Sequence, residues 1–222
     1  MDKNDFELLQ VNDSSFPIGS YTLSWGAETF VQQKIIFDFQ TAFSYLKNEV
    51  KSNFLTNELL PVRLAYEYAM NDEWSEVFKI DEIYNASKNA KEIREGSKKT
   101  AARFLKTVSL WQNVATKIRN LSAISHFSVM YGSYCSVRNI EESKVLKSFL
   151  YSQVSSRVIT LVKLIPLSQS DGQKILHALF DDFPSIIDCV MNLSEKDLCR
   201  SGPLSEIRAM QHEFLYTRLY MS

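Results

Sequence analysis

The chain has 222 residues, of which 45% are hydrophobic and 23% charged, and its 25 basic and 26 acidic side chains leave a net charge of about -1. This composition is typical of a single globular domain and excludes a disordered or fibrous chain. The near-neutral charge, with no cluster of Lys and Arg on one helix, disfavours a nucleic-acid-binding regulator. We find no signal peptide and no apolar run long enough to cross a membrane, so we expect a cytoplasmic protein.

Apolar residues recur at the three-and-four spacing of amphipathic helices along the whole chain. Five prolines separate the periodic segments, at places where a proline can begin or follow a helix. No internal repeat or low-complexity linker divides the chain. In chain order, the pattern predicts helices over residues 5–11, 25–33, 38–60, 61–71, 73–89, 91–118, 125–136, 142–165, 171–181, 184–193 and 203–220.

Local signals fix several of these boundaries. Asp38 and Ser24 are predicted N-caps, and Pro61 and Pro184 fit the first turns of their helices. Residues 157–165 are rich in β-branched side chains, which favour strands. We assign them to a helix because they continue the apolar face that precedes them. The prediction is an all-α fold, with residues 1–222 forming one bundle of about nine or ten helices.

No sequence motif for catalysis, cofactor binding or metal binding is present. The chain lacks a GxxxxGK phosphate loop, a GxSxG elbow and an HExxH pair. Its three cysteines have no CxxC spacing, and none of its three histidines has a second ligand at helical spacing. One alternative stays open, namely a helical enzyme whose acid–base site pairs Glu28 with His126 or His212 across the sequence.

The segment between residues 14 and 28 has the highest density of turn-forming residues in the chain. It reads SSFPIGSYTLSWGAE, in which Pro17 fixes one backbone angle and Gly19 permits a conformation closed to other residues. Ser24, Gly26 and Glu28 follow at the start of a predicted helix. Helix capping explains these residue types but not so dense a run of them.

These residues resemble the start of the UreF family of urease accessory proteins. Three later blocks resemble the family in the same order, and together the four blocks extend over nearly the whole chain. The first block comprises Leu8, Leu9, Asp13, Phe16, Pro17, Gly19, Ser24, Gly26 and Glu28. The later blocks comprise Arg94, Ser97, Arg103, Leu105, His126 and Gly132, then Ile165, Pro166, Leu167, Gln169 and Gln173, and finally Met210, His212, Glu213, Leu215, Arg218, Leu219 and Ser222.

The resemblance implies an all-helical, dimeric accessory protein that is not an enzyme. UreF-like proteins bind UreD (also called UreH) and recruit the GTPase UreG, and the complex delivers nickel to apo-urease. Nickel and GTP therefore act through partner proteins, and the resemblance implies no cofactor of the chain's own. Many members have a histidine where this chain has Leu23. We therefore interpret the first block as a shaped contact surface and not as a metal site.

Three groups of residues are the resulting site predictions. The C-terminal segment 203–222 carries an apolar stripe that includes Ile207, Met210 and Phe214, and we expect it to bind a partner. Tyr151 and Arg157, on the predicted helix 142–165, are candidates for a homodimer interface. The predicted partner-binding residues are Pro17, Gly19, Ser24, Gly26, Glu28, Arg94, Ser97, Met210, His212, Glu213, Arg218 and Leu219.

Overall fold

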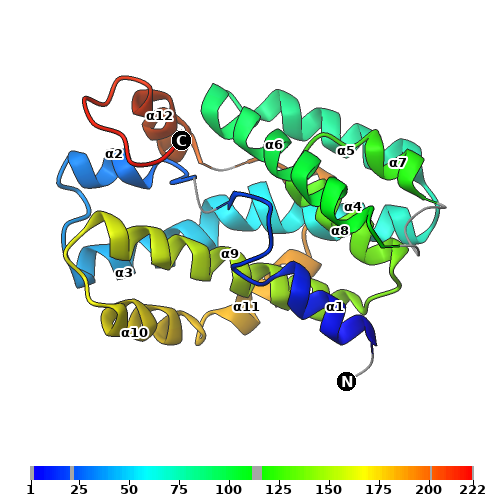
Figure 1. Cartoon of the computed structure of the whole chain (residues 1–222), viewed down its shortest axis with the longest axis horizontal. Helices are drawn as coiled ribbons and strands as arrows, with labels where there is room; N and C mark the ends of the chain where they lie inside the picture. The colour runs from blue at the N-terminus through cyan, green and yellow to red at the C-terminus, as the bar shows by residue number, and fades with distance from the viewer. Residues whose placement is uncertain (1–2, 21–22, 112–116, 201, 222) are drawn as a thin grey trace.

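The computed structural model describes residues 3–20, 23–111, 117–200 and 202–221, which are helical without any strand (Figure 1). The predicted all-α fold is confirmed. Within the described ranges no helix is long and apolar enough to cross a bilayer. The helices are α1 (Lys3–Val11), α2 (Ala27–Gln32), α3 (Phe39–Glu49), the π-helix η2 (Val50–Leu59), α4 (Leu60–Met70), α5 (Trp74–Ser87), α6 (Lys91–Val108), α7 (Ile118–Ser122), α8 (Phe127–Val137), α9 (Glu142–Leu164), α10 (Gln169–Leu179), α11 (Phe183–Met191), the 3-10 turn η4 (Glu195–Asp197) and α12 (Pro203–His212).

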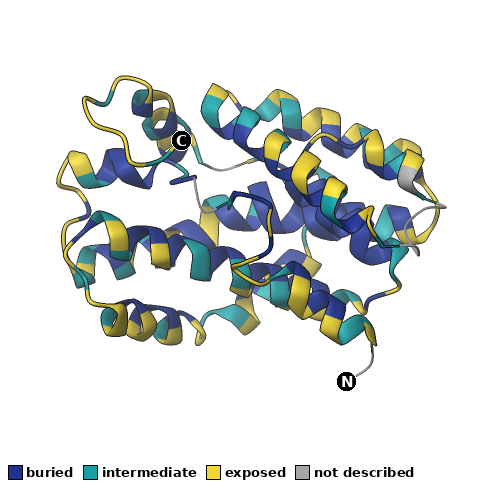
Figure 2. Ribbon diagram, viewed as in Figure 1, coloured by how far each residue is buried: buried dark blue, intermediate teal, exposed yellow. Residues whose placement is uncertain are grey.

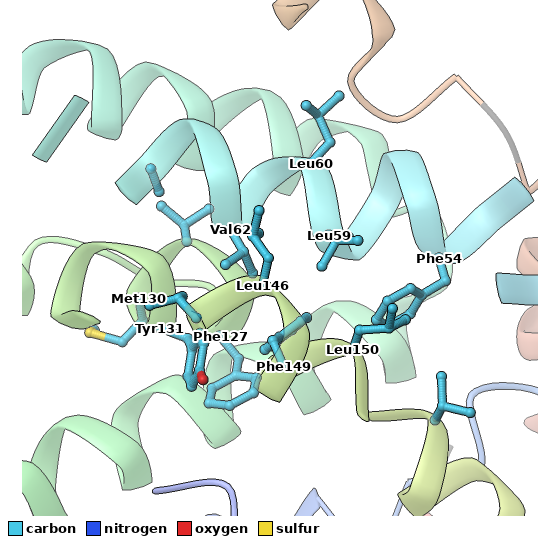
Figure 3. Close-up of a cluster of buried hydrophobic side chains, with 14 of the residues drawn as sticks. Phe54, Leu59, Leu60, Val62, Phe127, Met130, Tyr131, Leu146, Phe149 and Leu150 are labelled. Carbon is cyan, nitrogen blue, oxygen red and sulfur yellow. The ribbon is translucent and has the colours of Figure 1, made fainter. Parts of the chain in front are cut away.

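The core is built around α4 and α8, which pack closely against each other. Both helices are buried along most of their length, and the other helices cover them (Figure 2). Figure 3 shows the apolar side chains that α9 and η2 add to this core. The rings of Tyr131 and Phe149 lie 4.9 Å apart, and Phe54 stacks on Phe149 at 6.0 Å. A large aromatic core of this kind provides much of the apolar burial that stabilises a domain of this size.

The predicted break between residues 60 and 61 is absent, because α3, η2 and α4 follow one another without an intervening loop from Phe39 to Met70. Pro61 lies in the first turn of α4, as predicted. Inside an ordinary α-helix its ring would meet the carbonyl one turn earlier, and the wider π-helix before it relieves that conflict. The predicted N-cap at Asp38 is confirmed, because its carboxylate accepts from the Thr41 amide at 2.9 Å in a capping box.

Two predicted helices end early. The helix predicted over 91–118 ends at Val108, and Trp111 then turns inward to lie 6.3 Å from the Phe16 ring. Residues 112–116 of that prediction lie outside the described ranges. The helix predicted over 203–220 ends at His212. By contrast, the β-branched residues 157–164 are helical in α9, as the apolar pattern predicted.

The C-terminal segment returns to the start of the chain. In Figure 1, α12 lies beside α2, and residues 213–221 continue from α12 as an irregular tail near the same helix. Helix α12 also contacts α6. This arrangement brings the first and the last sequence blocks into one place.

Candidate functional site

The turn before α2 shapes the surface on which α12 lies. Trp25 and Gly26 both adopt positive φ values, 54° and 83°. A Cβ at Gly26 would stand 3.2 Å from the Ala209 amide nitrogen and 3.3 Å from the Ser205 carbonyl. The missing side chain therefore lets the backbone of α12 approach closely. The predicted cap is wrong, because Gly26 is the N-cap of α2, and Ser24 is buried one turn earlier, where its carbonyl accepts from the Ala27 amide at 3.0 Å.

A buried histidine joins α12 to two other elements. The ring of His212 has no exposed surface, and its Nε2 lies 3.0 Å from a carboxylate oxygen of Glu28 in α2. Its Nδ1 lies 2.6 Å from a carboxylate oxygen of Glu92 in α6. Each ring nitrogen thus faces one carboxylate oxygen within hydrogen-bond distance. We call His212, Glu28 and Glu92 the carboxylate–histidine cluster.

The tail after α12 is held by the same cluster. The Glu28 carboxylate accepts hydrogen bonds from the amides of Leu219 at 2.7 Å and Tyr220 at 3.1 Å. Arg218 pairs with Glu92 at 3.3 Å. Because Glu28 is buried and accepts three hydrogen bonds, it cannot be replaced by a neutral or shorter side chain without leaving donors unpaired.

Further polar contacts hold α12 and the tail along α2 and α6. Glu206 accepts from the Ala90 amide at 2.8 Å, at the start of α6. Thr29 donates to the Arg208 carbonyl at 2.9 Å, and Gln32 donates to the Thr217 carbonyl at 2.7 Å. The segment is therefore docked on its own chain chiefly through hydrogen bonds and ion pairs. The apolar part of this contact is a small cluster of Ala90, Ile93 and Ala209, with Trp25 packed against it.

The outer side of this segment is exposed (Figure 2), and many of its exposed side chains are apolar. The rest of the chain does not cover the predicted apolar stripe: Ile207 and Met210 are each 49% exposed, and Phe214 is 85% exposed. Leu204, Tyr216, Leu219 and Met221 add to the same exposed set. Exposed apolar side chains gathered on one short segment are typical of a surface that binds another protein.

A cavity of about 280 Å³ opens between the first block, α6 and the tail. Leu23 and Gly96 face each other in its wall, and a Cβ at Gly96 would come within 2.9 Å of the Leu23 side chain. Charged side chains of both signs line the rest of the cavity, namely Lys91, Glu92, Glu95, Lys99, Arg103 and Glu213. Across the described residues, no group of three or more His, Cys, Asp and Glu side chains is arranged to hold a metal ion.

Two predicted contact residues of α6 have internal partners. The Ser97 hydroxyl is buried and accepts from the Phe127 amide at 3.2 Å, which caps the start of α8. It also lies 3.2 Å from Nδ1 of His126. Arg94 donates to the Lys88 carbonyl at 2.7 Å, at the turn that precedes α6. Both residues stabilise the turn and helix starts beside the site, and Ser97 offers no surface to a partner in this structure.

The two candidate dimer residues lie in different environments. Tyr151 is exposed on α9 and its ring lies 6.1 Å from the Phe180 ring. Arg157 is buried, with its guanidinium 5.3 Å from the Trp25 ring and 5.0 Å from the Phe54 ring. Arg157 therefore packs inside this chain, and Tyr151 is the candidate that a second copy could reach.

The two histidines of the enzyme alternative are both enclosed. His126 lies between Ser97 and Asn85, each at 3.2 Å, so it does not pair with Glu28. Burial lowers the pKa of His126 to about 4, and nearby lysines act in the same direction. His212 does pair with Glu28, but both of its ring nitrogens are occupied and no part of the ring is exposed. No substrate can reach either ring in this conformation, so this geometry gives the enzyme alternative no support.

The site is thus a helical scaffold whose C-terminal segment is docked on its own chain by polar contacts and presents an exposed apolar face. The family model of UreF matches residues 36–180. Relatives named urease accessory protein UreF include those of Actinobacillus pleuropneumoniae serotype 5b (34% identical over 97% of both chains), Haemophilus influenzae strain Rd (32%, over 97% of this chain and 94% of the relative) and Ureaplasma urealyticum serovar 10 (30%, over 99% and 97%). The chain belongs to the UreF family, and with it to the accessory proteins of urease maturation.

Proposed function

We propose that this chain is a non-enzymatic scaffold that bridges UreD (UreH) and the GTPase UreG and regulates GTP-dependent nickel insertion into apo-urease. In this proposal nickel is cargo and GTP is the substrate of UreG, so neither needs a resident site in this chain. The scaffold acts in the cytoplasm as a homodimer. Tyr151 is the residue through which we expect one copy to meet the other.

The observation that carries the proposal is the two-sided character of the C-terminal segment. Its inner side is fixed by the carboxylate–histidine cluster, while Ile207, Met210 and Phe214 face outward. A partner that covers these side chains gains their apolar burial, about 25 cal/mol per Å² of area removed from water. We assign this face to UreD.

A pull-down with purified UreD tests this assignment. We expect Met210→Asp to abolish capture of UreD, because a carboxylate would then be buried at an apolar contact. Leu110→Asp is the matched control, since Leu110 is also exposed and apolar but lies after α6, outside the α12 face. Removal of residues 211–222 should likewise abolish capture without unfolding the core. A truncated chain that still captures UreD would contradict the assignment.

The bridging role needs a second measurement. Co-elution of the chain with UreD and UreG on a sizing column should require all three proteins. GTP hydrolysis by UreG should then change when the complex forms. If UreG binds UreD equally well without this chain, the scaffold role is wrong even if UreD capture is confirmed.

A further inference from the structure

A line of polar side chains, two buried and one half-buried, runs along one side of α3 and η2, far in sequence from α12. Glu49 is the last residue of α3, and Asn53 and Asn57 follow at intervals of four in η2. The Asn53 side-chain amide donates to Glu49 at 2.5 Å, and the Asn57 amide donates to the Asn53 carbonyl oxygen. We call these three residues the polar ladder.

The chain that leads into α12 lies directly on the polar ladder. Ser205, in the first turn of α12, donates to the second carboxylate oxygen of Glu49 at 3.0 Å. Gly202 has a φ of 115°, and a Cβ at this position would overlap the Asn53 side chain. The Cys199 amide donates to the Thr56 carbonyl of η2 at 3.2 Å. Cys199 is therefore bound to η2 and Ser205 to the end of α3 by hydrogen bonds, and Gly202 lies against Asn53 between them.

Apolar side chains would fill this space without specifying a position, whereas buried amides and carboxylates lose free energy unless their partners are in place. The ladder thus favours one placement of residues 202–205, and α12 begins at Pro203 within that segment. We propose that Asn53, at the centre of the ladder, is a positioning residue for partner binding. It holds the start of α12 so that the helix lies on α2 with its apolar face outward. This inference rests on the proposed binding of UreD.

Amide hydrogen exchange of Asn53→Ala tests the positioning role without a partner. We expect exchange of residues 203–212 to accelerate about fivefold, because Asn53→Ala removes the amide that fixes the Glu49 carboxylate to which Ser205 donates. Exchange of α4 and α8, and the thermal midpoint of the chain, should stay at their wild-type values. Asn48→Ala is the matched control, because Asn48 is exposed on α3, about one turn before Asn53.

Capture of UreD should weaken in Asn53→Ala in proportion to the fall in the fraction of chains whose α12 is docked, because only those chains present α12 in the binding position. Gly202→Ala tests the same contact from the other side, since the added methyl group meets Asn53 and the positive φ disfavours alanine. In the double variant, Asn53→Ala removes that overlap. The two substitutions should therefore accelerate exchange by less than the product of their separate effects.

Three results would overturn the positioning role: unchanged exchange of 203–212 in Asn53→Ala, an equal acceleration in α4 and α8, or a fall in the docked fraction with unchanged capture of UreD. The first would show that the ladder does not hold α12, and the second that it stabilises the fold as a whole. A wild-type chain that fails to capture UreD would overturn the proposed function, and the role of Asn53 in partner binding with it. In that case the exchange comparison still shows whether the ladder holds α12, because it needs no partner.

Discussion

Replacement of His212 by alanine is the most direct perturbation of the site. It removes the ring between Glu28 and Glu92 and leaves two carboxylates facing a void. Loss of one partner from a buried ion pair costs about 3–5 kcal/mol. We expect the lower end of this range, about 3 kcal/mol, because Glu28 keeps two backbone donors and Glu92 keeps Arg218.

The cost should fall on the docking of the C-terminal segment and not on global stability, since the cluster lies outside the large core around α4 and α8. A loss of about 3 kcal/mol raises the open fraction of the segment roughly a hundredfold. Amide exchange of residues 203–212 and protease cleavage within 213–221 measure this opening. His177→Ala is the matched control, because His177 is exposed on α10.

A double-mutant cycle between His212→Ala and Glu28→Gln then tests the cause. If the two side chains act as an ion pair, Glu28→Gln should cost about 2 kcal/mol less in the absence of His212 than in its presence. Additive effects would refute the reasoning. So would a His212→Ala variant whose segment 203–221 exchanges as slowly as that of the wild type.

Three further predictions concern the core and the surface. Burial lowers the pKa of His126 to about 4 in the folded chain, so the ring is neutral there at higher pH. The free energy of unfolding should therefore be full above pH 6.5 and fall by about 3 kcal/mol as the pH drops towards 4. Denaturant melts of His126→Gln should lose this pH dependence. Ser97→Ala should lower the free energy of unfolding by about 1–2 kcal/mol through the lost cap of α8, against no change for the exposed Ser170→Ala, and equal melts for both would contradict the cap. Tyr151→Asp should convert the proposed dimer to a monomer on gel filtration, and an unchanged dimer would rule out this face.

Helical periodicity predicted most of the fold because each helix buries one apolar face, and that regularity is local. It predicted α9 correctly, including its β-branched residues 157–164, which continue the apolar face. It missed that α3, η2 and α4 are continuous, because Pro61 is a reliable boundary signal only where the preceding turn is a regular α-helix. It also extended α12 too far, since the tail after His212 is held by hydrogen bonds to Glu28, 191 residues before Leu219.

The sequence predicted several residues of the site as partner-binding, and in the structure Glu28 and His212 are buried in contacts within the chain. The sequence blocks pointed to Glu28, His212, Arg218 and Leu219, and the structure brings all four together. Glu92 was missed, because it belongs to a charged run that has the pattern of a solvated helix face. Its signal in the sequence is closeness to Arg94 of the second block, and Glu95 lies even closer to Arg94, so closeness could not select Glu92.

The carboxylate–histidine cluster also sets an order of events during synthesis. Glu28 and Glu92 precede His212 by 184 and 120 residues, so both carboxylates are made long before the ring that joins them. Contacts of such long range form late in folding, because most of the chain must already be ordered. The helices of the core can assemble while the two carboxylates are still hydrated. A chain shortened just before residue 212 would therefore fold its centre and keep Ile207 and Met210, yet lack the ring that fixes their helix on α2 and α6, so the ordered contact surface marks a fully made molecule.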